Sequence, residues 1–476
     1  MLSISSRPLI AAALIGVAVL PTGCQHYEPR PLDLESHHLA WSARTPGDES
    51  IRALADRLAE TGDGGVFDPT DGLTLEEAEV VALVYNPDLR LQRLRAGIVA
   101  ARAGEAGRWA DPEFSFDLLR VTQGVPSPWV ITPGLALTIP ISGRLEAEKA
   151  KAGAALRVAL TEIAEQEWAT RLDLRAAWLR WSSALVRGEQ ASRLLASLEP
   201  LAAAAARLAN AGEMPATTTG LFDLERALQR QAVRRATADA EAWMLRVRQC
   251  MGLSPNAPIQ CVPTLQAAPA ARTGVDRVET LTLQRLRAQY EVAEQTLLLE
   301  IRKQYPDLVL GPLYERDQGQ SRIGLFGAIP IPILNANVKG IAEARAAREL
   351  ARAAYETEYE RLAGHFQNVQ ARQRAAAAGL RTLEEDIVPI VERQVATARR
   401  MVELGEVGID VLLESLIREG EICGELIEAR LQAALVGVDL ARLTTAAHAP
   451  HPALPVIQSD GGPAPHSVIP TQEVVP

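Results

Sequence analysis

The sequence contains four cysteines, and the first stands where a thiol can be lipidated. Arg7 precedes an apolar run of about 12 residues, too short for a spanning helix, which needs about 20. The run ends in Leu20-Pro21-Thr22-Gly23-Cys24. Small residues directly before a cysteine are typical of a lipoprotein signal peptide, in which a lipid such as palmitate becomes attached to the new terminus. The pattern predicts a lipid anchor at Cys24; the alternative is an ordinary export signal with an incidental cysteine.

Cys250 and Cys261 lie close together, across a turn-rich segment that follows a predicted helix. Disulfides are typical of oxidising compartments, which an exported chain would reach. A disulfide between Cys250 and Cys261 is therefore possible, and two free thiols fit the spacing equally well. Cys423 stands alone on a predicted helix, where we interpret it as a small buried apolar residue.

Patterns typical of catalysis or metal binding are missing from the sequence. It has no nucleophile elbow, phosphate-binding loop, cluster of metal ligands or carboxylate pair suited to a pocket. The scattered histidines predict no metal site; they include His37, His38, His448, His451 and His466. The formal net charge of −10 argues against a nucleic-acid partner. We therefore expect a protein that is not an enzyme and needs no cofactor.

Long helices are expected to make up most of the chain. Aromatic residues account for only 4% of the 476 residues, while Ala, Leu, Arg and Glu are abundant, which favours long helices over a bulky globular core. Helices predicted over residues 143–211 and 335–404 would each reach about 100 Å. Returning helices are predicted over residues 221–251 and 411–445. Thr74 and Glu77 form a capping-box pattern, and a short helix is expected over residues 51–60.

Part of the sequence occurs twice. The segment Gly134-Leu135-Ala136-Leu137-Thr138-Ile139-Pro140-Ile141 returns as Gly324-Leu325-Phe326-Gly327-Ala328-Ile329-Pro330-Ile331. A long helical run with one proline, Pro200 or Pro389, follows each copy. The period exceeds the ~20–50 residues of solenoid repeats, so it indicates duplication of a whole strand-and-helix unit. The predicted segments are a signal peptide (residues 1–23), an N-terminal tether (24–72), repeat 1 (73–265), repeat 2 (276–447) and a disordered tail (448–476).

Strands are predicted before each long helix. Polar and apolar residues alternate from Glu113 to Leu118, the period of a strand with two unlike faces. Further strands are predicted over residues 129–139, 307–314 and 322–329, where glycine and proline blur the alternation.

Four short strands cannot close a membrane barrel by themselves. Backbone polar groups that face lipid need partners, and barrels have at least about eight strands, so two chains would suffice and three would supply about twelve. Aromatic residues near the strands predict an interfacial belt; the alternative is a core-facing set in a soluble hairpin. They are Trp109, Phe114, Phe116, Trp129, Tyr305, Tyr314 and Phe326.

Several motifs, in this order, resemble those of one known family over residues 73–445. They are Cys24 followed by Tyr27 and Pro31, Leu73-Thr74-Leu75-Glu76-Glu77-Ala78, Asn86-Pro87-Asp88-Leu89, the two Ile-Pro-Ile strand exits, and Leu404-Gly405-Glu406-Val407-Gly408 before Asp410-Val411-Leu412. The chain resembles the TolC family of outer membrane efflux channels.

This resemblance implies a mainly α fold with a small β part and two structural repeats per chain. It implies a homotrimer whose twelve-stranded transmembrane β-barrel, with four strands per chain, continues into a long α-helical periplasmic tunnel. The implied function is a passive conduit of the cell outer membrane, lipid-anchored, with a periplasmic extension. Its implied partners are itself, outer membrane lipid, a periplasmic adaptor (membrane fusion) protein and an inner-membrane pump.

The resemblance also implies roles for residues at the ends of the long helices. Gly212 and Glu213, and Gly405, Glu406, Val407 and Gly408, match the helix tips that meet the adaptor. Asp410 matches the first of two acidic rings that narrow the tunnel. Leu413 occupies the second acidic position, with Glu414 adjacent, so a pore constriction would use Asp410 and Glu414. The alternative for Asp410 is a solvated residue stabilised by the dipole of its helix.

The alternative function is a periplasmic, lipid-anchored coiled-coil adaptor or scaffold protein without a pore. Such adaptors carry a single helical hairpin flanked by small β-domains. The duplicated strand pairs before long helices favour the channel. The sequence does not reveal the cargo.

Overall fold

The computed structural model describes residues 27–60, 66–122, 124, 126–266, 280–317 and 319–444. The predicted signal peptide, Cys24 and the predicted tail lie outside the described residues. The chain divides into two compact units, Met1–Arg44 and Thr45–Pro476. The first contains α2 (Leu34–Ser42), a helix that the sequence analysis did not predict. Asp33 caps it by accepting a hydrogen bond from the backbone N of Ser36 at 2.9 Å.

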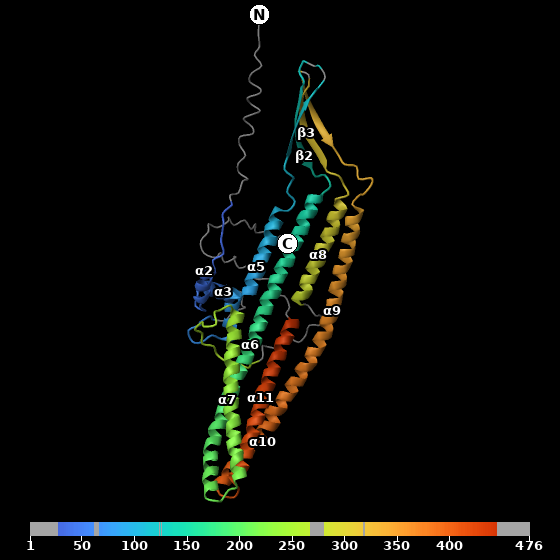
Figure 1. Ribbon diagram of the computed structural model, residues 1–476. Coiled ribbons are helices and arrows are strands. Elements are labelled where there is room, and N and C mark those ends of the chain that lie inside the picture. Colours follow the sequence, from blue (N-terminus) through green and yellow to red (C-terminus); the bar gives the residue numbers. More distant parts are fainter. Residues whose placement is uncertain are drawn as a thin grey trace. The chain divides into compact units, whose positions relative to one another are not determined.

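The second unit consists of long helices and one small sheet (Figure 1). Its elements, in chain order, are α3 (Glu49–Glu60), α4 (Leu75–Tyr85), α5 (Pro87–Glu105), β1 (Glu113–Arg120), β2 (Trp129–Ile139), α6 (Arg144–Asn210), α7 (Ala216–Met251), α8 (Leu281–Arg302), β3 (Leu308–Asp317), β4 (Gln320–Ala328), α9 (Val338–Arg381), η1 (Thr382–Ile387), α10 (Val388–Glu403) and α11 (Ile409–Thr444). None of the described helices is both long enough and apolar enough to cross a membrane.

The starts of α4 and α5 follow directly from local sequence. The predicted capping box is confirmed, since the Thr74 hydroxyl accepts from the backbone N of Glu77 at 3.3 Å and the Glu77 carboxylate accepts from the backbone N of Thr74 at 2.9 Å. Asn86 ends α4 and caps α5, where Pro87 takes the first helical position. The Asn86 side chain also donates to the carbonyl O of Cys250 at 2.8 Å, so the cap ties α5 to the end of α7.

The two long helical runs differ in how they accommodate proline. Helix α6 is continuous for 67 residues, or about 100 Å, through Pro200. The second run was predicted as one helix over residues 335–404 but is α9, a π-helix (η1) and α10. Proline has no N–H to donate and clashes with the preceding turn, and wider π-turns relieve both problems. Pro389 is the second residue of α10 and lies two residues after the end of η1, so the break lies in the turn before the proline.

The strands form one antiparallel sheet in the order β1-β2-β3-β4. Each strand pair that is adjacent in sequence forms a hairpin, and β2 pairs with β3 across the two halves of the chain. Gly311 of β3 has no side chain where β2 approaches, because a Cβ there would overlap the carbonyl O of Leu135. The two repeated segments therefore share one sheet.

A buried core joins α3, α4, α6 and α7 around the middle of α6. Trp178 is fully buried in it, and its ring stacks edge-on against Trp181 with centroids 5.3 Å apart. Glu79 of α4 is buried there as well and forms ion pairs with Arg171 and Arg175 of α6. This core fixes α4 and α7 against α6 between the sheet and the far ends of the helices.

Candidate functional site

The register of the sheet gives it one apolar face. Phe114, Phe116 and Leu118 of β1 pair with Leu135, Pro133 and Ile131 of β2. Because side chains alternate along strands, residues paired across strands share a face. The mainly apolar face comprises Phe114, Phe116, Leu118, Trp129, Ile131, Pro133, Leu135, Leu137, Ile139, Leu308, Leu310, Pro312, Tyr314, Ile323 and Leu325, together with Arg120, Arg316, Ser321 and Gly327 towards its ends.

The opposite face is more polar and contains smaller residues. It includes Glu113, Ser115, Asp117, Thr132, Gly134, Ala136, Thr138, Gly311, Glu315, Asp317, Arg322, Gly324 and Ala328, and also the apolar residues Leu119, Val130, Val309, Leu313 and Phe326. A sheet with one apolar and one polar face suits a boundary between an apolar medium and water.

Both edges of the sheet are open. β1 and β4 are the outer strands, and all of their residues are exposed. Their outer backbone N–H and C=O groups have no strand partner within the described chain. Such an edge is a template for pairing with another chain. The strands have 8, 11, 10 and 9 residues, close to the ~9–11 of a tilted membrane-spanning strand.

The predicted aromatic set is exposed, and the alternative of a core-facing set is not observed. Phe114 is 71% exposed and Trp129 is 48% exposed. Trp129 and Tyr314 lie on the apolar face, whereas the register places Phe326 on the opposite face. Trp109 and Tyr305 are exposed just before the strands. An interfacial belt therefore remains a prediction for the residues of the apolar face alone.

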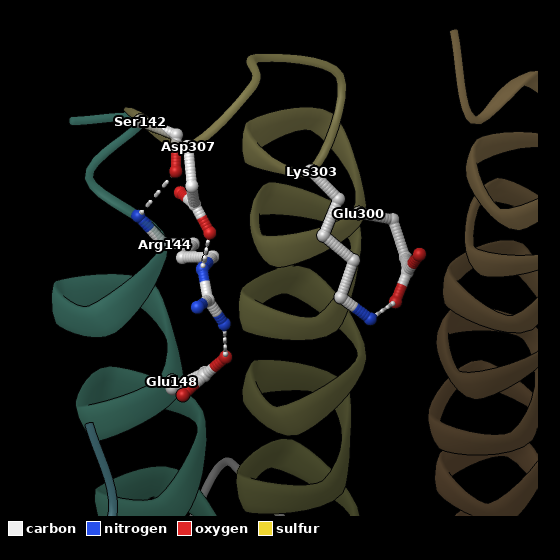
Figure 2. A network of polar contacts seen from close by, with 6 residues as sticks. All are labelled: Ser142, Arg144, Glu148, Glu300, Lys303 and Asp307. Atoms are coloured by element: carbon white, nitrogen blue, oxygen red, sulfur yellow. Dashed lines mark hydrogen bonds and ion pairs between the residues drawn. The ribbon is translucent and has the colours of Figure 1, made fainter. Parts of the chain in front are cut away.

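An ion pair fixes the junction between the sheet and the long helices. Nε of Arg144, the first residue of α6, donates to Oδ2 of Asp307 at 2.8 Å, directly before β3 (Figure 2). Arg144 also reaches Glu148 at 3.3 Å, and its backbone N donates to the Ser142 hydroxyl at 3.3 Å. Oδ1 of Asp307 is buried without a hydrogen-bond partner among the described residues. The contact joins the first half of the chain to the second.

A second junction contact lies at the end of α8. Nζ of Lys303 donates to Oε1 of Glu300 at 2.6 Å (Figure 2). The side-chain amide of Asn337 donates to Oε2 of Glu300 at 2.7 Å and to its carbonyl O at 2.8 Å. Hydrogen bonds from Lys303 and then Asn337 lower the pKa of Glu300, so its carboxylate is charged at neutral pH. This contact fixes the end of α8 against the start of α9.

The predicted helix tips have the same backbone geometry in both halves. Gly212 and Gly405 have φ of 78° and 72°, the left-handed conformation that glycine adopts without strain. The backbone N of Glu213 donates to Leu208 O at 2.9 Å, and that of Glu406 donates to Met401 O at 2.9 Å. Both are Schellman motifs, which satisfy the last carbonyls of α6 and α10. Apart from half-buried Val407, the predicted tip residues are exposed.

One apolar core lies beneath both tips. It contains Leu198 of α6, Phe222 of α7, Val395 of α10, and Leu412 and Leu413 of α11, together with neighbouring alanines and leucines. Leu413, at the position where the family pattern places a second acid, is 5% exposed and belongs to this core. The apolar residues at 409, 412, 413 and 416 follow helical spacing, a signal that could have placed Leu413 inside.

Asp410 and Glu414 are both exposed, four residues apart on α11. Residues with this spacing lie on the same side of a helix. Asp410 lies in the first turn of α11, where the helix dipole favours a negative charge, and its Oδ1 lies where a Cβ of Gly408 would be. The structure thus gives two carboxylates on one exposed side of α11, next to the second tip.

Within the described residues, the cysteines and possible metal ligands form no site. Cys250, Cys261 and Cys423 are free thiols in the structure, so the disulfide that the spacing allowed is not formed in it. Burial raises the pKa of Cys261 to about 12 and also raises that of Cys250, which keeps both thiols protonated. In the part of the chain that is described, His, Cys, Asp and Glu side chains nowhere gather in threes as metal ligands would.

Solved structures with the same arrangement of sheet and helices are outer membrane channels. The chain superposes on the transmembrane channel protein CusC with a TM-score of 0.65 and 12% identity, over 78% of this chain and 91% of that one. The outer membrane protein VceC of Vibrio cholerae superposes with a TM-score of 0.63 and 15% sequence identity. The match covers 77% of this chain and 94% of VceC. The CmeC outer membrane channel of Campylobacter jejuni superposes with a TM-score of 0.64 and 13% sequence identity. The match covers 78% of this chain and 85% of CmeC. No protein-family model and no curated protein matches the chain.

The chain has the fold of the TolC family of outer membrane channels. The predicted fold class, mainly α with a small β part, is confirmed, with one four-stranded sheet in each chain. In this TolC-type fold the tips and the sheet lie at opposite ends of α6 (Figure 1).

Proposed function

We propose that the chain is an outer membrane efflux channel, a passive conduit without enzymatic activity. The observation that carries this proposal is the open sheet with one apolar face, attached to helices about 100 Å long in a TolC-type fold. The apolar face would contact outer membrane lipid, and the helices would extend as a tunnel into the periplasm.

The order of the strands supports closure of a barrel by identical copies. Neighbouring strands are antiparallel, so β1 and β4 run in opposite directions. β4 of one copy can therefore pair with β1 of the next in an antiparallel arrangement, and a rotational ring leaves no open edge. Three copies would supply about twelve strands. We propose this homotrimer, with residues 73–265 and 276–447 as its paired repeats.

The carboxylates of α11 would form the constriction of the tunnel. Around a rotation axis, Asp410 and Glu414 of each copy would form two acidic rings, one helical turn apart. Rings of carboxylates attract cations and set the selectivity of a pore. Since Leu413 is part of the tip core, Glu414 takes the place of the second ring.

The exposed tips would contact a periplasmic adaptor protein, which would link the channel to an inner-membrane pump. Gly212, Glu213 and residues 405–408 are the proposed contacts, because they lie at the end of the helices farthest from the sheet. A lipid on Cys24 would anchor the protein to the outer membrane.

Engineered disulfides between edge strands test the closed barrel. Phe116→Cys on β1 would be combined in turn with Ser321→Cys, Ile323→Cys and Leu325→Cys on β4, all on the apolar face. Oxidation in outer membranes should link chains covalently up to a trimer for at least one combination. Each single variant, and Phe116→Cys with Leu137→Cys on inner strand β2, serves as a control and should remain monomeric after denaturation. Failure of every combination, with the protein present in the membrane, would contradict barrel closure.

The alternative of a pore-less adaptor predicts a different outcome. An adaptor would need no pairing between β1 and β4, and the apolar face would have no lipid to contact. The four-stranded sheet with two open edges favours the channel.

A further inference from the structure

A cavity of about 610 Å³ is lined by residues of α6, α7, α9 and α11. This volume falls in the range of about 300–1,000 Å³ that is typical of sites for small organic molecules. The cavity shares no residue with the tips or with the sheet. It belongs to a single chain, so its existence does not depend on the proposed trimer.

Three ion pairs between helices form much of the wall. They are Arg187–Glu428, Arg372–Asp439 at 3.4 Å and Arg442–Asp173 at 2.9 Å. Each pair neutralises one arginine with one carboxylate and connects α11 to α6 or α9. These charges are already matched within the protein, and the pairs hold the surrounding helices in place.

Two further charged residues in the cavity lack such partners. The guanidinium of Arg180 on α6 lies over the ring of Trp243 on α7, with Cζ 5.1 Å from the ring centroid. Its one hydrogen bond goes to Ala176 O of its own helix, at 3.2 Å. Asp239 lies one helical turn before Trp243. Among the described residues, neither Arg180 nor Asp239 forms an ion pair. One positive and one negative residue without an ion-pair partner in the described structure thus line the same cavity as Trp243.

The rest of the lining is suited to an apolar group. Leu435 and Val438 of α11 contribute aliphatic surface, and Trp243 contributes part of its indole ring. Ser183 also lines the cavity, and its hydroxyl is buried without a hydrogen-bond partner in the described structure. Rotation about its Cα–Cβ bond would present this hydroxyl to a bound molecule, which would satisfy a polar group that is otherwise unpaired.

We propose that the cavity binds a zwitterionic organic molecule that carries a small apolar ring. The carboxylate of the ligand would accept hydrogen bonds from Arg180, and its ammonium group would donate to Asp239. The ring would lie against Leu435 and Val438. An anion alone would leave Asp239 unmatched, and a cation alone would leave Arg180 unmatched, so the two charges together select a molecule that carries both.

A matched series of probes tests the proposed class of ligand. L-phenylalanine, 3-phenylpropionate and 2-phenylethylamine share a ring and differ only in their charged groups. In calorimetric titrations of the full chain in detergent, phenylalanine should bind at least about tenfold more tightly than either singly charged probe, because it alone forms hydrogen bonds with both charged residues. Equal affinity for the three probes, or no saturable binding of phenylalanine, would overturn the proposal.

Substitutions assign each charge of the ligand to its residue. Arg180→Gln should lower the affinity for phenylalanine about tenfold and leave the affinity for 2-phenylethylamine unchanged. Asp239→Asn should lower the affinity for phenylalanine by the same factor and leave the affinity for 3-phenylpropionate unchanged. Arg234→Gln and Asp223→Asn are matched controls on α7, outside the cavity, and should bind as the parent does. Circular dichroism should show that all four variants are folded. Unchanged phenylalanine binding in Arg180→Gln or Asp239→Asn would contradict the site, and because the assay needs no pore, this result would leave the channel proposal unaffected.

Discussion

Gly311 of β3 lies against the carbonyl O of Leu135 in β2, so closely that a Cβ would overlap it. This contact is part of the only pairing that joins the two halves of the chain within the described sheet.

Gly311→Ala should therefore separate β2 from β3 and prevent assembly of the sheet. Forcing extra atoms into a close-packed contact costs about 1–3 kcal/mol. Gly324→Ala on β4 is the matched control, because a Cβ there would meet no atom within 4 Å. Heat-modifiable migration of protein from outer membranes measures assembly: Gly311→Ala should lose the folded band and Gly324→Ala should keep it. The same band in both variants would show that β2 and β3 are not paired in this way.

The burial of Leu413 predicts a structural role at a position that the family pattern makes acidic. Leu413→Ala should lower stability by about 2–5 kcal/mol, because it removes buried methyl groups and leaves a cavity. Leu404→Ala is the control, since Leu404 is 66% exposed at the same tip. This variant should lose less than about 1 kcal/mol of stability. Hydrogen exchange of the backbone amides of α10 and α11 measures the stability loss in both variants. Equal protection of these amides in the two variants would mean that Leu413 is outside the core.

The Arg144–Asp307 pair should couple the sheet to α6. A double-mutant cycle with Arg144→Gln and Asp307→Asn should give a coupling energy of about 1 kcal/mol or more, because both side chains are mostly buried. The exposed pair Lys339–Glu343, at 3.8 Å on α9, should give a coupling near zero in the same assay. Urea unfolding in detergent supplies the energies. Equal couplings for the two pairs would argue against the junction contact.

Glu419 on α11 should make the second tip less stable as the pH rises. Burial raises the pKa of this carboxyl, Arg399 opposes the effect, and Glu392 adds to it. The folded state therefore binds the proton more tightly than the unfolded state. The contribution of Glu419 to the stability of the fold is fully present below the ordinary glutamate pKa of about 4.3. It is lost as the pH rises through the higher pKa of the folded state.

Glu419→Gln should accordingly be more stable than the parent at pH 7 and equal to it near pH 4. Thermal unfolding of the two proteins at both pH values measures the difference. Glu406→Gln, at the exposed tip, is the control for the loss of one glutamate charge. If Glu419→Gln were less stable than the parent at pH 7, the charged carboxylate would stabilise the fold, which would contradict the predicted effect of burial.

Local sequence predicted the elements well where glycine, proline and caps mark their ends. The strand expected over residues 129–139 is β2, and the helix expected over 143–211 is α6 within a residue at each end. Proline also marks the break that was not predicted, since Pro389 lies two residues after the end of the π-helix. Helix α7 begins at Ala216, earlier than predicted, where the backbone N–H groups of Thr218 and Thr219 donate to the carbonyl O of Pro215.

Long-range contacts could not be predicted in the same way. The common apolar face depends on the pairing of β2 with β3, and the alternation within β3 and β4 is interrupted by Gly311, Pro312 and Gly324. Arg144 and Asp307 are far apart in sequence, and nothing local to either residue indicates the other. Asp410 and Glu414 are exposed, and their place in a constriction stays a prediction, because neighbouring copies would form the pore.

Conductance in planar lipid bilayers tests the central proposal most directly. The purified full chain should insert in uniform steps and pass cations in preference to anions, and Asp410→Asn with Glu414→Gln should reduce that preference while the steps remain. Gly311→Ala, which should not assemble, is the matched negative control. An absence of steps from protein that is folded and oligomeric would contradict the channel.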